Sequence, residues 1–200
     1  MTEAPPKLAA RALVPQKTQR VRGGSMLATD ASMVVLRIVH IATGVIWVGS
    51  LFVVVFFVQP SAATLGPAGT PFMAELRRRR FVDVVFIDAV FTVLAGAILY
   101  WHDWHLQATF NDWISTSFGK TLTVGALLAI AGLGVAGSVT RPTIRRLVSI
   151  GTQVAESGAP PSPEAAARIG ALQYRLVVAE RTSFTLVLLA VVAMSSARYI

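Results

Sequence analysis

Four apolar runs, each about long enough to cross a lipid bilayer, dominate this sequence of 200 residues. A helix needs about 20 apolar residues to cross the hydrocarbon core of a membrane. The hydrophobic share of 54% is also high for a soluble domain. We therefore predict an all-α fold, a polytopic membrane protein built as a four-helix transmembrane bundle with short surface helices in its loops. The predicted spans cover residues 33–58, 81–101, 118–139 and 176–199.

The first 32 residues differ in character from the rest of the chain. They contain Pro5, Pro6 and Pro15 together with several basic residues, and they show no apolar periodicity. Such a segment cannot bury enough apolar surface to offset the entropy lost on ordering. We predict a disordered N-terminal tail at residues 1–32 and one transmembrane domain at residues 33–200.

Prolines and arginines mark the predicted loops. Gln59 and Pro60 are expected to end the first span. Thr70 and Pro71 suit the N-cap and the first position of a short surface helix that leads into the arginines of residues 77–80. The segment after the third span is predicted to be a surface loop, followed by a helix that feeds the fourth span.

The distribution of basic residues predicts the orientation of the chain. The first loop contains the arginines of residues 77–80, and several more follow the third span, whereas residues 102–117 contain neither Lys nor Arg. Because basic loops stay in the cytoplasm, loops 59–80 and 140–175 are predicted to be cytoplasmic, with both termini external.

The formal net charge of +8 has the same explanation. The basic residues lie between or before the apolar runs, where they attract anionic headgroups. The expected partner is thus the lipid bilayer and not a nucleic acid, with a further membrane subunit or a second copy of the chain as open additions.

Acidic residues at the cytoplasmic end favour a network of ion pairs. Asp83 and Asp88 begin the second span, and Arg175, Glu180 and Arg181 begin the fourth. We predict that these groups pair and hold the second span against the fourth. The alternative is that Asp88 relays protons.

The three histidines are predicted to gather at the opposite end. His40 lies about seven residues inside the first span, roughly 10 Å deep. An ionisable group at that depth suggests a function, although a neutral His40 bonded to a neighbouring helix is the alternative. His102 and His105 share a helical face as candidate metal ligands, or belong to an interfacial aromatic belt. Lys120 is a candidate iron ligand or anion partner, or extends to the headgroups.

Small residues recur on one face of the third span. They are Gly125, Ala129, Gly132 and Ala136. Such a face lets another backbone or a flat ligand approach closely, so we expect Gly132 to face another helix or a cofactor.

The first span also carries a short pattern formed by Arg37, His40, Trp47 and Gly49. This pattern resembles a set of bacterial membrane proteins that includes CopD-type copper-resistance proteins, their uncharacterised four-helix relatives and HemJ-type protoporphyrinogen oxidases. The chain end, residues 194–199, is similar to the uncharacterised relatives. The resemblance covers about residues 33–200.

The resemblance implies particular ligands. In the HemJ type the first-span histidine binds haem b and a lysine at the start of span three is functionally important; His40 and Lys120 match these positions. The glycine after Trp47 is one residue nearer than in that type, and Lys120 lacks its neighbouring histidine, so protoporphyrinogen oxidation is not implied. The CopD type implies copper handling, yet the methionines here form no thioether cluster.

Three functions stay open. The first is a b-type haem-binding redox membrane protein, with His40 as axial ligand and Lys120 or His102 as second ligand or anion partner. Trp47 would pack near the haem, for which Gly44 and Gly96 would make room. The second is a cofactor-free structural or accessory membrane subunit. The third is copper or metal-ion handling with His40 and His102 as ligands. The sequence contains no recognisable enzyme motif, so enzymatic activity is not assigned.

Overall fold

The computed structural model describes the backbone of residues 20–200. The chain divides into two compact units, Met1–Val35 and Leu36–Ile200. Helix α1 (Arg20–Val53) begins in the first unit and continues into the second. Residues 1–19 of the expected tail lie outside the described residues, whereas residues 20–32 are helical, because a helix that is already formed extends at little cost.

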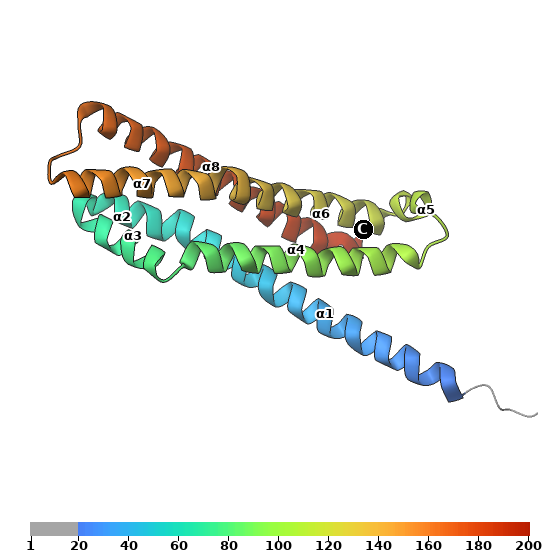
Figure 1. Ribbon diagram of the computed structural model, residues 1–200. Helices are drawn as coiled ribbons and strands as arrows, with labels where there is room; N and C mark the ends of the chain where they lie inside the picture. Colours follow the sequence, from blue (N-terminus) through green and yellow to red (C-terminus); the bar gives the residue numbers. More distant parts are fainter. Residues whose placement is uncertain (1–19) are drawn as a thin grey trace, which may run out of the picture. The chain divides into compact units, whose positions relative to one another are not determined.

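The second unit consists of helices, and no strand occurs among the described residues. After α1 the elements are η1 (Val54–Val58), α2 (Gln59–Thr64), η2 (Gly66–Ala68), α3 (Gly69–Arg78), α4 (Phe81–His105), α5 (Phe110–Ser115), α6 (Ser117–Val135), η3 (Ala136–Thr140), α7 (Arg141–Ser157), α8 (Pro163–Ser196) and η4 (Ala197–Tyr199). In Figure 1, α4, α6 and α8 run side by side, with α2, α3 and α7 at the end opposite α5.

Four helical runs are long and apolar enough to cross a membrane, which confirms the predicted all-α bundle of four spans. They are Ala31–Thr64, Phe81–His105, Ser117–Ser157 and Pro163–Tyr199. Large apolar side chains such as Val45, Phe91 and Leu127 are exposed along them, as expected for surfaces that face lipid.

Two of the predicted helix ends are absent because π-helical turns accommodate the prolines. Pro60 follows η1 and Pro142 follows η3, and in both cases the helix continues. At the end of each turn the backbone bond spans five residues, from Gln59 to Val54 and from Arg141 to Ala136. The wider turn leaves room for a proline ring where an α-helix would have lost a hydrogen bond.

The expected surface loop after span three is therefore wrong in its first part. Helix α7 extends the third span to Ser157, and the loop itself is confined to the turn before α8. The helix that was predicted to feed the fourth span is present as the first half of α8. Likewise, α3 begins at Gly69, just before the predicted Thr70 cap.

The small-residue face of α6 packs against α8, as predicted for Gly132. The Ser183 hydroxyl donates to the Gly132 carbonyl at 3.0 Å. A side chain at Gly132 would meet Val187, and one at Gly125 would meet Met194. The absence of these side chains lets the two helices approach closely.

Candidate functional site

His40 is held against α4 by a hydrogen bond to the backbone. Its Nδ1 lies 2.8 Å from the Thr92 carbonyl oxygen, so this nitrogen carries the proton and Nε2 is deprotonated in the neutral ring. Nε2 has no hydrogen-bond partner among the described residues. A Cβ on Gly96 would lie 2.7 Å from the His40 Cε1 atom. The imidazole therefore occupies the space that Gly96 was expected to leave for a haem.

The other predicted site residues lie elsewhere. His102 contacts Asp103 at 3.4 Å, and Lys120 is exposed at the start of α6. Trp47 is buried in the bundle core against Ala89 and Val187. None of the contacts within the described residues joins these side chains to His40.

The end of the bundle that carries His102 and His105 otherwise consists of aromatic side chains and paired polar side chains. His105 packs against Trp101 and Trp104, with ring centroids 4.1 and 4.6 Å away. Arg37 lies 3.7 Å from Asp103. In the part of the chain that the structure describes, no group of three or more His, Cys, Asp or Glu side chains could hold a metal ion.

The ion-pair network at the opposite end differs from the predicted one. Asp83 pairs with Arg141 at 2.6 Å, which joins α4 to the start of α7 and not to the fourth span. Glu180 instead accepts a hydrogen bond from the Gln59 amide, which joins α8 to α2. The difference arises because α7 continues span three and brings Arg141 to the position where α4 begins. Asp88 has a buried oxygen without a partner among the described residues.

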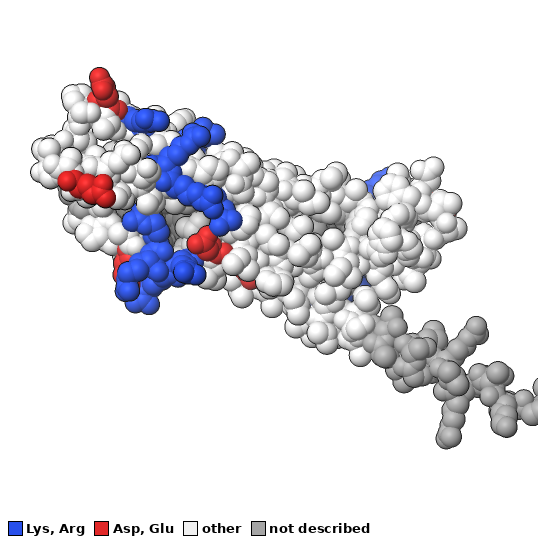
Figure 2. Space-filling model, viewed as in Figure 1, with Lys and Arg blue, Asp and Glu red and all other residues white. Residues whose placement is uncertain are grey.

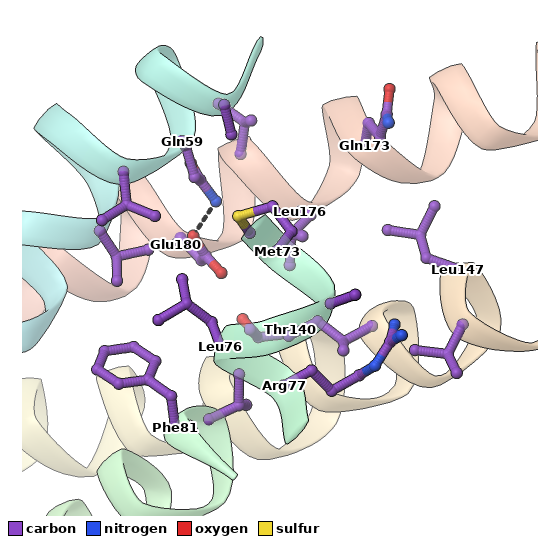
Figure 3. A pocket seen from close by; sticks show the side chains of 18 of the residues that line it. Gln59, Met73, Leu76, Arg77, Phe81, Thr140, Leu147, Gln173, Leu176 and Glu180 are labelled. Atoms are coloured by element: carbon purple, nitrogen blue, oxygen red, sulfur yellow. Dashed lines mark hydrogen bonds between the residues drawn. The ribbon is translucent and has the colours of Figure 1, made fainter. Parts of the chain in front are cut away.

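A large cavity lies beside this Gln59–Glu180 contact. Its volume is about 1180 Å³, and its walls come from α1, α2, α3, α4, α7 and α8, with the π-helical turns η1 and η3. Most of the wall is apolar, from Trp47 and Ala89 at the bundle core to Met73 and Leu147 in the surface helices. Figure 3 shows these helices surrounding the opening.

Polar residues are a minority of the cavity wall; besides Thr140 and Glu180 they are Ser50, Gln59, Thr70, Arg77, Arg141, Thr152, Glu156, Gln173 and Ser183. Thr140 and Glu180 line it and are only 8% and 7% exposed. The Thr140 hydroxyl has no hydrogen-bond partner in the described residues. One carboxyl oxygen of Glu180 accepts from Gln59, and Figure 3 shows the other pointing into the cavity. No basic side chain in the described region forms an ion pair with Glu180.

Arginines surround this end of the molecule. Arg77 and Arg141 line the cavity, and a shallower depression between α3, α4 and α7 adds Arg80 and Arg145. Arg77 extends from α3 toward α7 in Figure 3. In the view of Figure 2, the basic side chains form a band across the end that carries α3 and α7. The cavity thus combines an apolar wall, a buried carboxyl group and a basic surround.

Sequence reasoning missed this site, although two signals were present. Glu180 lies inside the fourth predicted span, where an acid is costly, and Gln59 is the last polar residue before Pro60. Glu180 was assigned to the ion-pair network because charged residues surround it in the sequence. Only the packing of α2 against α8 shows that its partner is an amide.

The fold, the surroundings of His40 and the cavity beside Glu180 together define a class of protein. The chain is a multi-pass membrane protein, an all-α bundle with four apolar spans. No protein-family model matches it, and neither a curated protein nor a solved structure is significantly similar to it.

Proposed function

We propose that this chain is a membrane-embedded binding protein for a lipid-like molecule, which occupies the cavity beside Glu180. The observation that carries the proposal is the cavity of about 1180 Å³ with a mainly apolar wall. Ligand sites in proteins are typically clefts of about 300–1,000 Å³ lined by apolar side chains with a few convergent polar groups. The cavity is slightly larger than this range, and its mainly apolar lining with a minority of polar groups agrees with the description.

The position of the cavity also supports a lipid-like occupant. The cavity extends from Trp47 and Ala89 in the core of the spans to Gly151 and Ile169 on the surface helices. A molecule that fills it would have apolar surroundings over most of its length. Burying apolar surface contributes about 25 cal/mol per Å², so a long hydrocarbon chain supplies most of the binding free energy.

A substitution that fills the cavity tests the proposal. Gly151 lines the cavity, and a side chain added there meets nothing within 4 Å. Gly151→Trp should therefore fill part of the cavity without disturbing the fold. Gly170→Trp is the matched control, because Gly170 also has open space around it but lies outside the cavity.

The measurement is scintillation proximity with the protein in nanodiscs and four tritiated probes that share a twelve-carbon chain: dodecane, 1-dodecanol, laurate and dodecylammonium. At least one probe should bind saturably to wild type and to Gly170→Trp, and its affinity should fall at least tenfold in Gly151→Trp. The proposal is wrong if no probe binds wild type saturably. It is also wrong if every probe binds Gly151→Trp as tightly as wild type while both variants keep the wild-type melting temperature.

A second candidate function is the binding of haem b by His40. The Nδ1 hydrogen bond to the Thr92 carbonyl favours it, because such a bond orients the ring and leaves Nε2 available to a metal. His40 is the residue that would hold the iron, and the haem would supply electron-transfer chemistry. The space beside Gly96 does not support a haem, since the imidazole fills it.

The absorption spectrum distinguishes this candidate from a cofactor-free accessory subunit. Protein purified from haem-supplemented cells should show a Soret band that is lost or shifted in His40→Ala if His40 is the axial ligand. Lys120→Met then tests the second ligand, because it retains the apolar stem and removes the amine. A colourless wild type, or an unchanged spectrum in His40→Ala, would assign His40 to helix packing alone.

A further inference from the structure

Two buried oxygens inside the cavity have hydrogen-bonding capacity that the described protein groups do not use. The Thr140 hydroxyl has no partner, and it is 92% buried, given its exposed fraction of 8%. One oxygen of Glu180 is held by Gln59, whereas the other points into the cavity. A buried polar group without a partner is costly. Figure 3 shows Thr140 and Glu180 beside the same part of the cavity, so their two oxygens offer hydrogen bonds to a ligand within a mainly apolar wall.

The charges around the cavity limit what can occupy that position. Arg77, Arg141 and Glu156 line the same cavity, and Arg80, Arg145 and Asp83 lie in or beside the adjoining depression, where Asp83 pairs with Arg141. Arginines therefore outnumber carboxylates around the opening, and this excess opposes a cationic ligand. The Glu180 carboxyl group, which has no basic partner in the described region, opposes an anionic group at its side.

From these two observations we infer that the ligand is an uncharged amphiphile with a hydroxyl group at its polar end. Its hydroxyl lies between Glu180 and Thr140, and its hydrocarbon chain lies along the apolar wall. The inference rests on the proposed function and adds the chemical class of the ligand. A hydroxyl group suits the position because it donates one hydrogen bond and accepts others. It can donate to the carboxyl oxygen and accept from the threonine.

The four twelve-carbon probes test the class directly, because they differ only in the end group. 1-Dodecanol should bind wild type tightest, about 3- to 10-fold tighter than dodecane, as expected for one net hydrogen bond. Laurate and dodecylammonium should bind more weakly than the alcohol. Tighter binding of dodecylammonium would overturn the inference in favour of an ion pair with Glu180, and tighter binding of laurate would overturn it in favour of anchoring by arginine.

Thr140→Val distinguishes a binding role from a structural one. The valine keeps the shape and removes a hydroxyl that has no partner in the described residues, so the melting temperature should stay the same or rise. The affinity for 1-dodecanol should nevertheless fall about 3- to 10-fold, while that for dodecane stays unchanged. Thr143→Val is the control, because Thr143 is buried nearby in α7 but does not line the cavity.

Glu180→Gln gives an independent measurement. The amide keeps the size of the side chain and can still bond to Gln59, but it removes the ionisable carboxyl group. Laurate should gain affinity relative to 1-dodecanol in this variant. If Gly151→Trp abolishes probe binding while Thr140→Val and Glu180→Gln leave the order of the probes unchanged, the cavity binds lipid-like molecules and the inferred hydroxyl position is wrong.

Discussion

At the scale of single residues, the bundle depends on positions where a missing side chain admits a neighbouring group. Gly96 is such a position, because the His40 imidazole lies against it and reaches the Thr92 carbonyl. Thr140 is the opposite case, because its buried hydroxyl has no hydrogen-bond partner among the described residues. Both residues are small and neither forms part of a sequence motif.

Gly96→Ala should destabilise the protein by about 1–3 kcal/mol, the usual cost of inserting a methyl group into a packed site. The new Cβ would lie 2.7 Å from the His40 ring, so the ring must leave the Thr92 carbonyl. Gly134→Ala is the control, because its Cβ meets nothing within 4 Å, and it should be neutral or slightly stabilising. Unfolding in mixed detergent micelles measures both, and equal stabilities of the two variants would contradict the expectation.

At the scale of elements, the contact between α6 and α8 organises the spans. Small residues on α6 face α8, and the Ser183 hydroxyl bonds across the contact to Gly132. The π-helical turn η3 then carries the same helix past Pro142 into α7. The helical run that packs against α8 therefore also continues into α7, which lines the cavity.

Gly132→Leu should separate α6 from α8. A Cβ at this position would lie 2.6 Å from the Val187 Cγ2 atom, and the larger leucine cannot be accommodated by rotating one flexible side chain. We expect a loss of about 2–4 kcal/mol on the scale of severe overpacking. Gly134→Leu, two residues along the same helix and exposed, should retain wild-type stability. A wild-type melting temperature in Gly132→Leu would show that this contact is dispensable.

The surface helix α3 should respond to acid. Arg78 and Arg79 donate to the Glu75 carboxyl group and lower its pKa below the ordinary value of 4.5. Because the pKa is lower in the folded helix than in an unfolded chain, the ion pairs stabilise α3 above pH 4.5 and are lost as the pH falls through the lowered value. Amide hydrogen exchange in α3, corrected for intrinsic rates, should accelerate below that pH. Glu75→Gln should remove this pH dependence, and persistence of the effect in the variant would assign it to another group.

At the scale of the whole molecule, charge separates the two ends of the second unit. Arginines gather over α3 and α7, whereas residues 102–117, which include α5, contain no Lys or Arg. The structure thus places the first and third loops at the same end, as expected because two spans lie between them. The cavity is at the basic end and His40 is nearer the other.

The orientation of the bundle follows from this asymmetry. Basic segments are retained in the cytoplasm, so the end with α3 and α7 should be cytoplasmic and the C-terminus external. A reporter inserted within residues 66–74 should score as cytoplasmic, and one inserted between residues 106 and 110 should score as external. The opposite pattern would reverse the predicted topology and would place the cavity mouth outside the cell.

The number of spans and their places in the chain follow from the sequence alone, because hydrocarbon demands about 20 consecutive apolar residues and a satisfied backbone wherever the chain crosses it. The face of Gly125 and Gly132 could be predicted for a similar reason, since close helix packing in lipid requires small residues at helical spacing. His40 could be identified as an intramembrane polar residue. These properties depend on neighbours that are near in sequence.

The tertiary structure alone determined which polar groups meet. It pairs Asp83 with Arg141 and Glu180 with Gln59, because two π-helical turns carry the helices past Pro60, which was expected to end the first span, and past Pro142. It also leaves the Thr140 hydroxyl without a partner among the described residues, in a cavity whose walls come from helices far apart in the chain. Such a cavity depends on side-chain volumes and helix directions from segments far apart in the chain, and no local pattern of residues encodes them.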